Sequence, residues 1–278
     1  MFNYTIKFTS IISLSLVLFS CGNENTDDID EIPVEESTTT ASADTHKVSA
    51  QNVFNTLPNR QIVLDIITES KAEYDPNLLN NPDDVAKYST ETSKALNFGV
   101  FGADLNVTSV FEQTQESILF LKCVNVLAKN LGVNNVFDEK MMNRMDANRD
   151  NRDSTMTIVS ESFRKTDEFL VTNNRPSTSS LIVAGAWVEG MYIACATTKK
   201  SGYGKSIRVI FEQKKSLNYL VELLVAAKAN EKVDYLITDL KKIETICSSK
   251  PDNNYTISDL TKLDVAITAL RLKIVSSI

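Results

Sequence analysis

Two stretches of small and apolar residues decide the fold: LIVAGAWVEGMYIACA at residues 181–196 and ALNFGVFGA at residues 95–103. Each has a small residue at every fourth place, namely Ala186, Gly190 and Ala194 in the first and Ala95, Gly99 and Ala103 in the second. Residues four apart share one face of a helix, so this spacing lets two helix backbones approach closely. We therefore predict two central core helices. Glu189 interrupts the first apolar run, so we do not expect that helix to span a membrane.

The chain after residue 47 repeats its apolar residues at helical spacing. Steps of three and four place one stripe near the C-terminus: Leu260, Leu263, Ile267, Leu270 and Ile274. A second stripe precedes it: Val233, Leu236, Leu240, Ile243 and Cys247. Cap signals accompany these patterns: Asn81 ahead of Pro82, Gly132 after a helical run, and Thr256 three residues ahead of Asp259.

Turn residues are scarce, since glycine and proline together number only 14 (8 and 6). A β-sandwich or barrel would need more of them, together with alternating strand patterns. We predict an all-α domain over residues 48–278, with seven or eight helices of about 12–25 residues. Short connections favour antiparallel neighbours, so we expect a single, mostly antiparallel up-and-down bundle. A helical repeat whose sequence has decayed is the alternative.

The N-terminus has the pattern of an export signal. Residues 1–7 carry one positive charge, and an apolar run of about a dozen residues, roughly 18 Å as a helix, follows. A membrane span needs about 20 apolar residues, so we interpret residues 1–20 as a signal peptide. Its end, Leu18-Phe19-Ser20-Cys21, resembles the lipobox of bacterial lipoproteins, which implies cleavage before Cys21 and a diacylglyceryl group on its thiol. The alternative is an anchor helix with an incidental cysteine.

Residues 21–47 are strongly acidic. They contain eight acidic side chains, and no Lys or Arg precedes Lys47 in this segment. The whole chain has 36 acidic and 29 basic residues, for a net charge of −7; without the eight tether acids and Lys7, 28 of each remain. We expect a disordered tether before a formally neutral domain. A neutral domain offers no basic surface, so we expect no nucleic-acid partner.

The tether has two interpretations. One is a solvated spacer between the membrane and the domain. The other is an export address, because Asn23 to Asp28 is similar to the acidic cluster that follows the lipidated cysteine in surface-exposed lipoproteins of Bacteroidota.

Several kinds of chemistry are disfavoured by the residues present. The one histidine, His46, lies in the tether, so the domain has no histidine base for a Ser–His–Asp or Cys–His arrangement. Gly202 to Ser206 ends like a P-loop but lacks the first glycine, and we interpret it as an interhelical turn. Asp146 to Asp150 begins like an EF-hand loop, but Asn151 and Thr157 replace its glycine and glutamate. We interpret it as a polar helix junction and predict no metal and no cofactor.

Three cysteines follow Cys21, at positions 123, 195 and 247, and each has apolar neighbours at helical spacing. Small buried thiols are one interpretation. A disulfide with one thiol left free is the other, because an exported protein can be oxidised.

The remaining candidate site consists of polar residues on otherwise apolar helices. Asp104 follows the 95–103 stretch, and Glu189 lies inside the 181–196 stretch. With Gln113, Tyr192 and Tyr88 nearby, they would form a ligand pocket between the helices. Two carboxylates in one pocket raise the pKa of at least one of them and suit acid/base catalysis. The alternative is that each acid caps a helix, pairs with a basic residue or faces solvent.

Two further stretches, ALNFGVFGADL at residues 95–105 and VFEQTQESILFLKCVNVLAKNLGV at residues 110–133, carry a family resemblance. Over Tyr88 to Gly132, about 45 residues, the chain resembles a family of uncharacterised helical lipoproteins of Bacteroidota. The resemblance implies a lipoprotein and a helical domain, and it implies no activity. The positions that match the family pattern are Ala95, Leu96, Gly99, Phe101, Gly102, Ala103, Asp104 and Leu105.

We expect a non-enzymatic binding or scaffold module, held in the cell envelope by lipidated Cys21, with an envelope protein or a small ligand as partner. The expected place is the outer membrane, on its periplasmic face or at the cell surface. A carrier of a small or lipid-like ligand near Asp104 and Glu189 is the alternative, and an acid/base hydrolase is the third. A cavity of several hundred Å³ would favour the carrier. Carboxylates about 5–9 Å apart in an open cleft would favour the hydrolase.

The lipidation prediction is tested by feeding cells a clickable fatty acid. We expect the wild-type chain to carry the label and Cys21→Ser to lose it, because the thiol is the acceptor. Equal labelling of the two proteins would contradict the lipobox interpretation.

Overall fold

The structure is a computed structural model that describes residues 72–133, 135–148, 151–201, 206–227, 233–250 and 254–276. All of them belong to the unit Thr38–Ile278. The predicted signal peptide, the lipidated Cys21, the tether with His46 and the turn at 202–205 lie outside the described residues. Their interpretations therefore stay predictions.

Helices make up the described ranges, which contain no strand, and the all-α prediction is confirmed. Two short 3-10 helices come first, η1 (Pro76–Leu78) and η2 (Pro82–Lys87). Nine α-helices follow within the same ranges: α3 (Glu91–Val110), α4 (Thr114–Asn130), α5 (Glu139–Ala147), α6 (Arg152–Thr172), α7 (Pro176–Ser201), α8 (Ser206–Glu212), α9 (Lys214–Ala226), α10 (Asp234–Cys247) and α11 (Ile257–Val275).

The described ranges contain more helices than the seven or eight predicted, because two of the helices are too short to be recognised from the spacing of apolar residues. α8 and α9 are separated by Gln213 alone, whose N–H donates to the Ile210 carbonyl three residues back at 3.1 Å. This tighter bond ends α8 before α9 begins. α5 has nine residues, of which only Met141 and Met145 are buried, too few to show a helical period.

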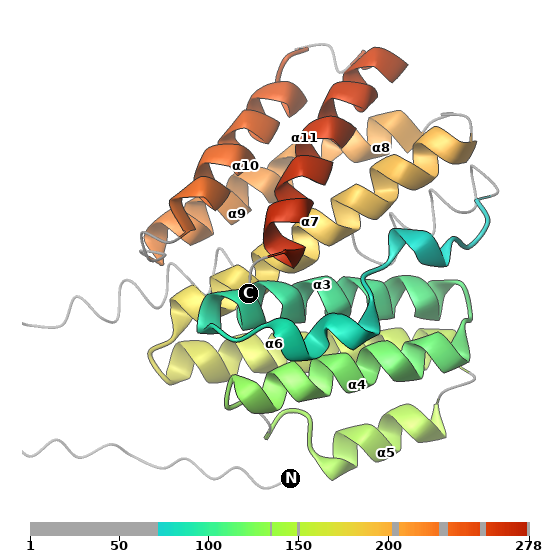
Figure 1. Cartoon of the computed structure of the whole chain (residues 1–278), viewed down its shortest axis with the longest axis vertical. Coiled ribbons are helices and arrows are strands. Elements are labelled where there is room, and N and C mark those ends of the chain that lie inside the picture. The colour runs from blue at the N-terminus through green and yellow to red at the C-terminus, as the bar shows by residue number, and fades with distance from the viewer. Residues whose placement is uncertain are drawn as a thin grey trace, which may run out of the picture. The chain divides into compact units, whose positions relative to one another are not determined.

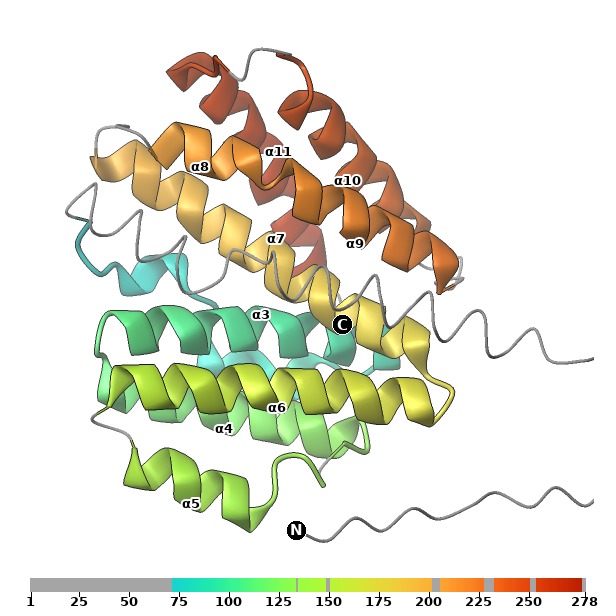
Figure 2. The same cartoon turned by 180° about the vertical axis from the view of Figure 1, so that it is seen from behind.

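α3 and α7 occupy the centre of the described part. α3 packs against α7 and also against α4 and α6, whereas α7 packs in addition against α8, α9 and α11. Figures 1 and 2 show α3, α4, α5 and α6 running alongside one another, with α8 to α11 gathered around α7 at an incline to them. α4 runs back along α3 after a turn at residues 111–113, and α11 runs back along α10.

The two predicted core helices approach closely at their glycines. A methyl group on Gly99 would lie 2.0 Å from the Ile182 carbonyl oxygen, and one on Gly185 would lie 1.9 Å from the Leu96 carbonyl oxygen. Both helices therefore touch through backbone atoms. The prediction of small-residue packing is confirmed for Gly99, but on α7 the glycine at the contact is Gly185, which the predicted spacing did not include.

The predicted apolar stripes are buried. Leu260, Leu263, Ile267, Leu270 and Ile274 of α11 are at most 1 % exposed. The α10 stripe is buried in the same way. α7 is long and apolar enough to cross a membrane, but 78 % of its most apolar window is buried inside the protein, as a central core helix requires.

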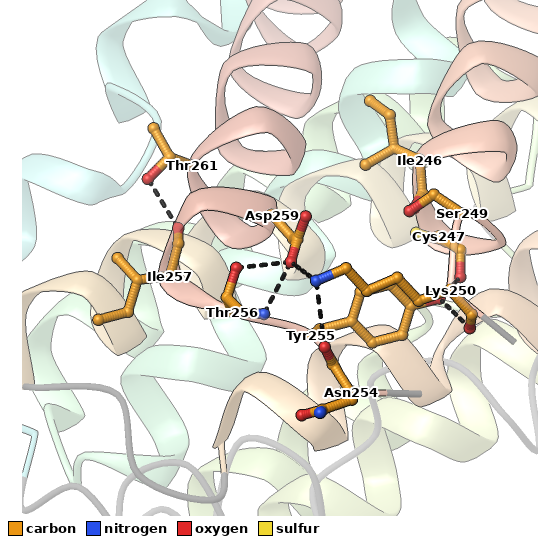
Figure 3. A network of polar contacts seen from close by, with 10 residues as sticks. All are labelled: Ile246, Cys247, Ser249, Lys250, Asn254, Tyr255, Thr256, Ile257, Asp259 and Thr261. Carbon is orange, nitrogen blue, oxygen red and sulfur yellow. Dashed lines mark hydrogen bonds and ion pairs between the residues drawn. The ribbon is translucent and has the colours of Figure 1, made fainter. Parts of the chain in front are cut away.

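A polar network joins the end of α10 to the start of α11 (Figure 3). Asp259 accepts hydrogen bonds from the Thr256 backbone N–H at 2.8 Å and from Lys250 Nζ at 2.6 Å. The Tyr255 hydroxyl donates to the Cys247 carbonyl at the end of α10. The Thr256–Asp259 spacing thus marks the start of α11, as predicted.

The close contact of α3 with α7 predicts a large effect of one methyl group. Alanine at position 185 gains about 1 kcal/mol of helix propensity over glycine. However, its Cβ would clash with the Leu96 backbone of α3, which cannot rotate away as a side chain can. We expect Gly185→Ala to lower the free energy of unfolding by about 2 kcal/mol or more, measured by urea denaturation.

Gly102→Ala is the matched comparison, because its methyl group would meet the Phe163 ring, a side chain, at 2.0 Å. We expect a smaller loss of stability there, since a ring can move more readily than a helix backbone. An equal or greater loss for Gly102→Ala would contradict the backbone contact as the tighter constraint.

Candidate functional site

Asp104 of α3 and Glu189 of α7 come together in the structure with Arg271 of α11. Both acids are fully buried, and each carboxyl group shifts the pKa of the other. Arg271 Nε donates to Glu189 Oε2 at 2.7 Å and its Nη2 donates to Oε1 at 2.8 Å, a two-pronged ion pair. Its side chain is 11 % exposed. We call Asp104, Glu189 and Arg271 the carboxyl cluster.

The carboxyl cluster contains two acidic side chains and one basic side chain. A proton on one of the acids balances the charges. Burial raises the pKa of Asp104 well above its usual value, and the nearby charge of Glu189 raises it further. Burial also raises the pKa of Glu189, but Arg271 opposes that effect. Protonated Asp104 can donate to the Glu189 carboxylate, which stays ionised against Arg271. Asp104 Oδ1 has no other hydrogen-bond partner among the described residues.

The carboxyl cluster also holds the segment that precedes α3. The Asn80 N–H donates to Asp104 Oδ2 at 3.1 Å, and Arg271 Nη2 lies 3.4 Å from the Leu78 carbonyl. The Tyr88 hydroxyl accepts from Asn80 Nδ2 at 3.1 Å. The cluster therefore connects α3, α7, α11 and residues 78–80.

The other predicted pocket residues have different places. The Tyr192 ring lies against Arg271, with the guanidinium carbon 4.3 Å from the ring centre, a cation–π contact. Gln113 lies beyond the end of α3, where its side-chain amide donates to the Phe111 carbonyl at 2.8 Å. No hydrogen bond or ion pair in the described ranges connects Gln113 to Asp104 or Glu189. Of the five predicted residues, the structure groups Asp104, Glu189 and Tyr192, links Tyr88 to them through Asn80, and leaves Gln113 apart.

Arg271 was not predicted, although a signal was present. It follows Ile267 by four residues and precedes Ile274 by three, so it lies at the edge of the buried α11 stripe. A basic residue in that position needs a buried partner or a route to water. Local spacing does not say which acid, 82 residues away, supplies it.

A separate cavity of about 360 Å³ lies between the end of α3 and helices α4, α5 and α6. Its apolar lining comes from Ile118 and Leu121 of α4 and from Met142 and Met145 of α5. Its polar lining consists of Ser109, Glu112, Thr114, Ser117, Asp146, Arg152 and Thr155. We call this the α4–α6 cavity. Neither Asp104 nor Glu189 lines it.

Of the stretch that resembles the start of an EF-hand loop, Asp146 lines this cavity. α5 ends at Ala147 and α6 begins at Arg152, so the stretch is a helix junction, as interpreted. Arg149 and Asp150 lie outside the described residues. Within the described ranges, no group of three or more His, Cys, Asp or Glu side chains is arranged to hold a metal ion.

The three cysteines of the described part are free thiols and buried. Burial raises the pKa of the Cys123 thiol to about 11 and that of Cys247 to about 12, and it raises that of Cys195 well above its usual value. Protonated thiols are poor nucleophiles. The interpretation of small buried thiols is confirmed, and Cys123, Cys195 and Cys247 form no disulfide with one another.

The protonated state of Asp104 predicts a pH dependence of stability. The folded protein keeps a proton that the unfolded chain releases above its usual pKa of 3.8, so this contribution to stability falls as pH rises. Asparagine has no such proton. Between pH 5 and 6.5 we expect wild type to lose stability relative to Asp104→Asn as pH rises, by at most about 1.4 kcal/mol per pH unit, in urea unfolding.

Asp259→Asn is the control with the opposite sign. Hydrogen bonds from Lys250 and Thr256 lower the pKa of Asp259, so its contribution is complete above the usual pKa and is lost only as pH falls. We expect a constant loss of about 1 kcal/mol over the same pH range. Parallel curves for wild type and Asp104→Asn would contradict a protonated Asp104.

Comparison with known proteins identifies neither of these two sites. No family model, no curated protein and no solved structure matches the chain. The resemblance of residues 88–132 to helical lipoproteins of Bacteroidota stays a prediction. A function for this chain therefore rests on the geometry of the carboxyl cluster and of the α4–α6 cavity.

Proposed function

We propose that this chain is a membrane-anchored, non-enzymatic module that binds a small amphipathic molecule in the α4–α6 cavity. The observation that carries the proposal is the cavity itself, about 360 Å³ with both apolar and polar side chains in its lining. Its volume lies in the range of small-molecule sites, about 300–1,000 Å³. A lining of both kinds suits a ligand that has an apolar part and a polar part.

Exposure favours the cavity over the carboxyl cluster as the ligand site. Asp104 and Glu189 are 0 % exposed, and a general acid or base must come within hydrogen-bond reach of its substrate. Each acid of the cluster already has a partner. The cavity reaches the surface, where the side chain of Glu112 is 75 % exposed. We therefore place the ligand pocket at the end of α3 and not, as predicted from the sequence, at its middle.

The proposed anchor gives the module access to such ligands. Acyl chains on Cys21 would hold the chain at a membrane, and a flexible tether of about 25 residues spans roughly 25–30 Å. Amphipathic molecules concentrate at membranes, so a module held there would meet them. We propose the cell envelope, and the outer membrane within it, as the location.

The cavity proposal is tested by filling the cavity. Ile118 lines the cavity and is only partly buried, so tryptophan at this position places an indole in the cavity without displacing the main core. We expect native mass spectrometry of wild type, purified from its own membrane, to show a bound small molecule that Ile118→Trp lacks.

Leu119→Trp is the matched control, because Leu119 is the next residue of α4, is 46 % exposed and does not line the cavity. We expect it to carry the same small molecule as wild type, and circular dichroism to show that both variants are folded. The same adduct on all three proteins, or none on any, would contradict the proposal.

A further inference from the structure

We propose that the outward side of α11 is a surface that docks on an anionic lipid bilayer. This inference rests on the membrane location proposed above and is independent of the α4–α6 cavity. Three observations support it: the residues that α11 exposes, the charges beside them and the small size of the exposed area. Figure 1 shows α11 on one side of the domain, with no described element in front of it.

α11 buries one apolar stripe and exposes a second. Ile257 is 49 % exposed, Val265 63 % and Leu272 56 %. Steps of eight and seven residues, about two turns each, bring these three side chains to one side of the helix, along about 22 Å of its length. We call the exposed residues of α11 the α11 face: Ile257, Ser258, Thr261, Lys262, Val265, Ala269, Leu272 and Lys273.

The charge that α11 presents to solvent is positive. The two charged residues of the α11 face, Lys262 and Lys273, are both basic. The acids of α11, Asp259 and Asp264, have side chains only 11 % and 13 % exposed, and each is paired with a lysine from outside the helix. Lys273 pairs with Asp239 of α10 at 2.6 Å, but the lysine side chain is 53 % exposed and the aspartate 14 %. The acids thus lie lower in the surface than the lysines.

α6 is the useful comparison, because it also lies at the surface and is of similar length. Its exposed residues include charges of both signs and no large apolar side chain. An isolated apolar residue on a surface needs no explanation, but a row of them rimmed by polar residues marks an interaction site. The exposed residues of α6 are Asp153, Thr157, Ser160, Arg164, Lys165, Glu168 and Thr172.

The α11 face is too small for a stable pair with a second copy of the chain. Stable protein interfaces use about 20–30 residues from each partner, whereas the α11 face has eight. Two copies of the face would also bring four lysines and no acid of the face into one interface, which like-charge repulsion disfavours.

An anionic bilayer matches both the apolar row and the lysines. Helices that lie at a membrane surface bury their apolar face about 5–10 Å deep and keep lysines near the head groups. Lys262 and Lys273 are three turns apart and so lie on the same edge of the helix, where both ammonium groups would meet lipid phosphates. A chain already tethered at the membrane meets this surface at high effective concentration, so a weak contact is enough.

Val265→Trp tests the contact, because the indole would enter the acyl-chain region of a docked bilayer. The full chain is reconstituted into vesicles of equal parts phosphatidylglycerol and phosphatidylcholine, with or without bromine on the phosphatidylcholine acyl chains. Bromine quenches a tryptophan that it contacts, so we expect quenching of Val265→Trp. Trp187, the single native tryptophan, is fully buried and gives a constant background. Leu119→Trp, on the exposed side of α4, is the matched control, and we expect no quenching beyond that of wild type.

The charge of the bilayer and of the face are tested in the Val265→Trp chain. We expect the quenching to disappear in vesicles of phosphatidylcholine alone. Lys262→Gln in the same chain should lower the ratio of docked to undocked molecules about fivefold, the worth of one lysine near an anionic surface. Equal quenching without phosphatidylglycerol would overturn the anionic requirement.

Flotation of the vesicles separates this inference from the proposed location. A chain that floats with the vesicles while Val265→Trp is quenched no more than Leu119→Trp would overturn docking through α11 and leave the membrane location intact. A chain that does not float with them would contradict both. Circular dichroism shows that each variant is folded.

Discussion

The contact between Gly99 and Gly185 sets the position of the other elements in the described chain. Since neither residue has a side chain, α3 and α7 meet through their backbones, and α4, α6, α8, α9 and α11 pack against one or both of them. Asp104 and Glu189 follow the two glycines by five and four residues, so the same contact carries both acids into the interior. Buried carboxylates need neutralising partners. Arg271 provides one, and a proton on Asp104 provides the other.

The carboxyl cluster explains how the first and last elements of the described chain are held together. Arg271 of α11 is 82 residues beyond Glu189, and residues 78–80 precede α3, yet both segments are bound to the same cluster. α3 then links this cluster to the α4–α6 cavity, because Asp104 lies in its middle and Ser109 near its end. The carboxyl cluster and the α4–α6 cavity therefore share one helix, although neither Asp104 nor Glu189 lines the cavity.

Much of the fold could be predicted because burial repeats along a helix. The α10 and α11 stripes, the start of α11 at Thr256 and the end of α4 at Gly132 all follow from local spacing. The pairing of Glu189 with Arg271 could not be predicted, since it depends on how distant helices pack. The cavity could not either, because it arises where four elements fail to fill a space. Its one local signal is the pair Met142 and Met145 in the otherwise polar α5.

The central claim is that the α4–α6 cavity holds a ligand, and a crystal structure of the protein purified from its own membrane tests it most directly. The account predicts electron density for a small amphipathic molecule between Ile118 and Met145. A cavity closed by Met142 and Met145, or one that holds only water, would contradict it.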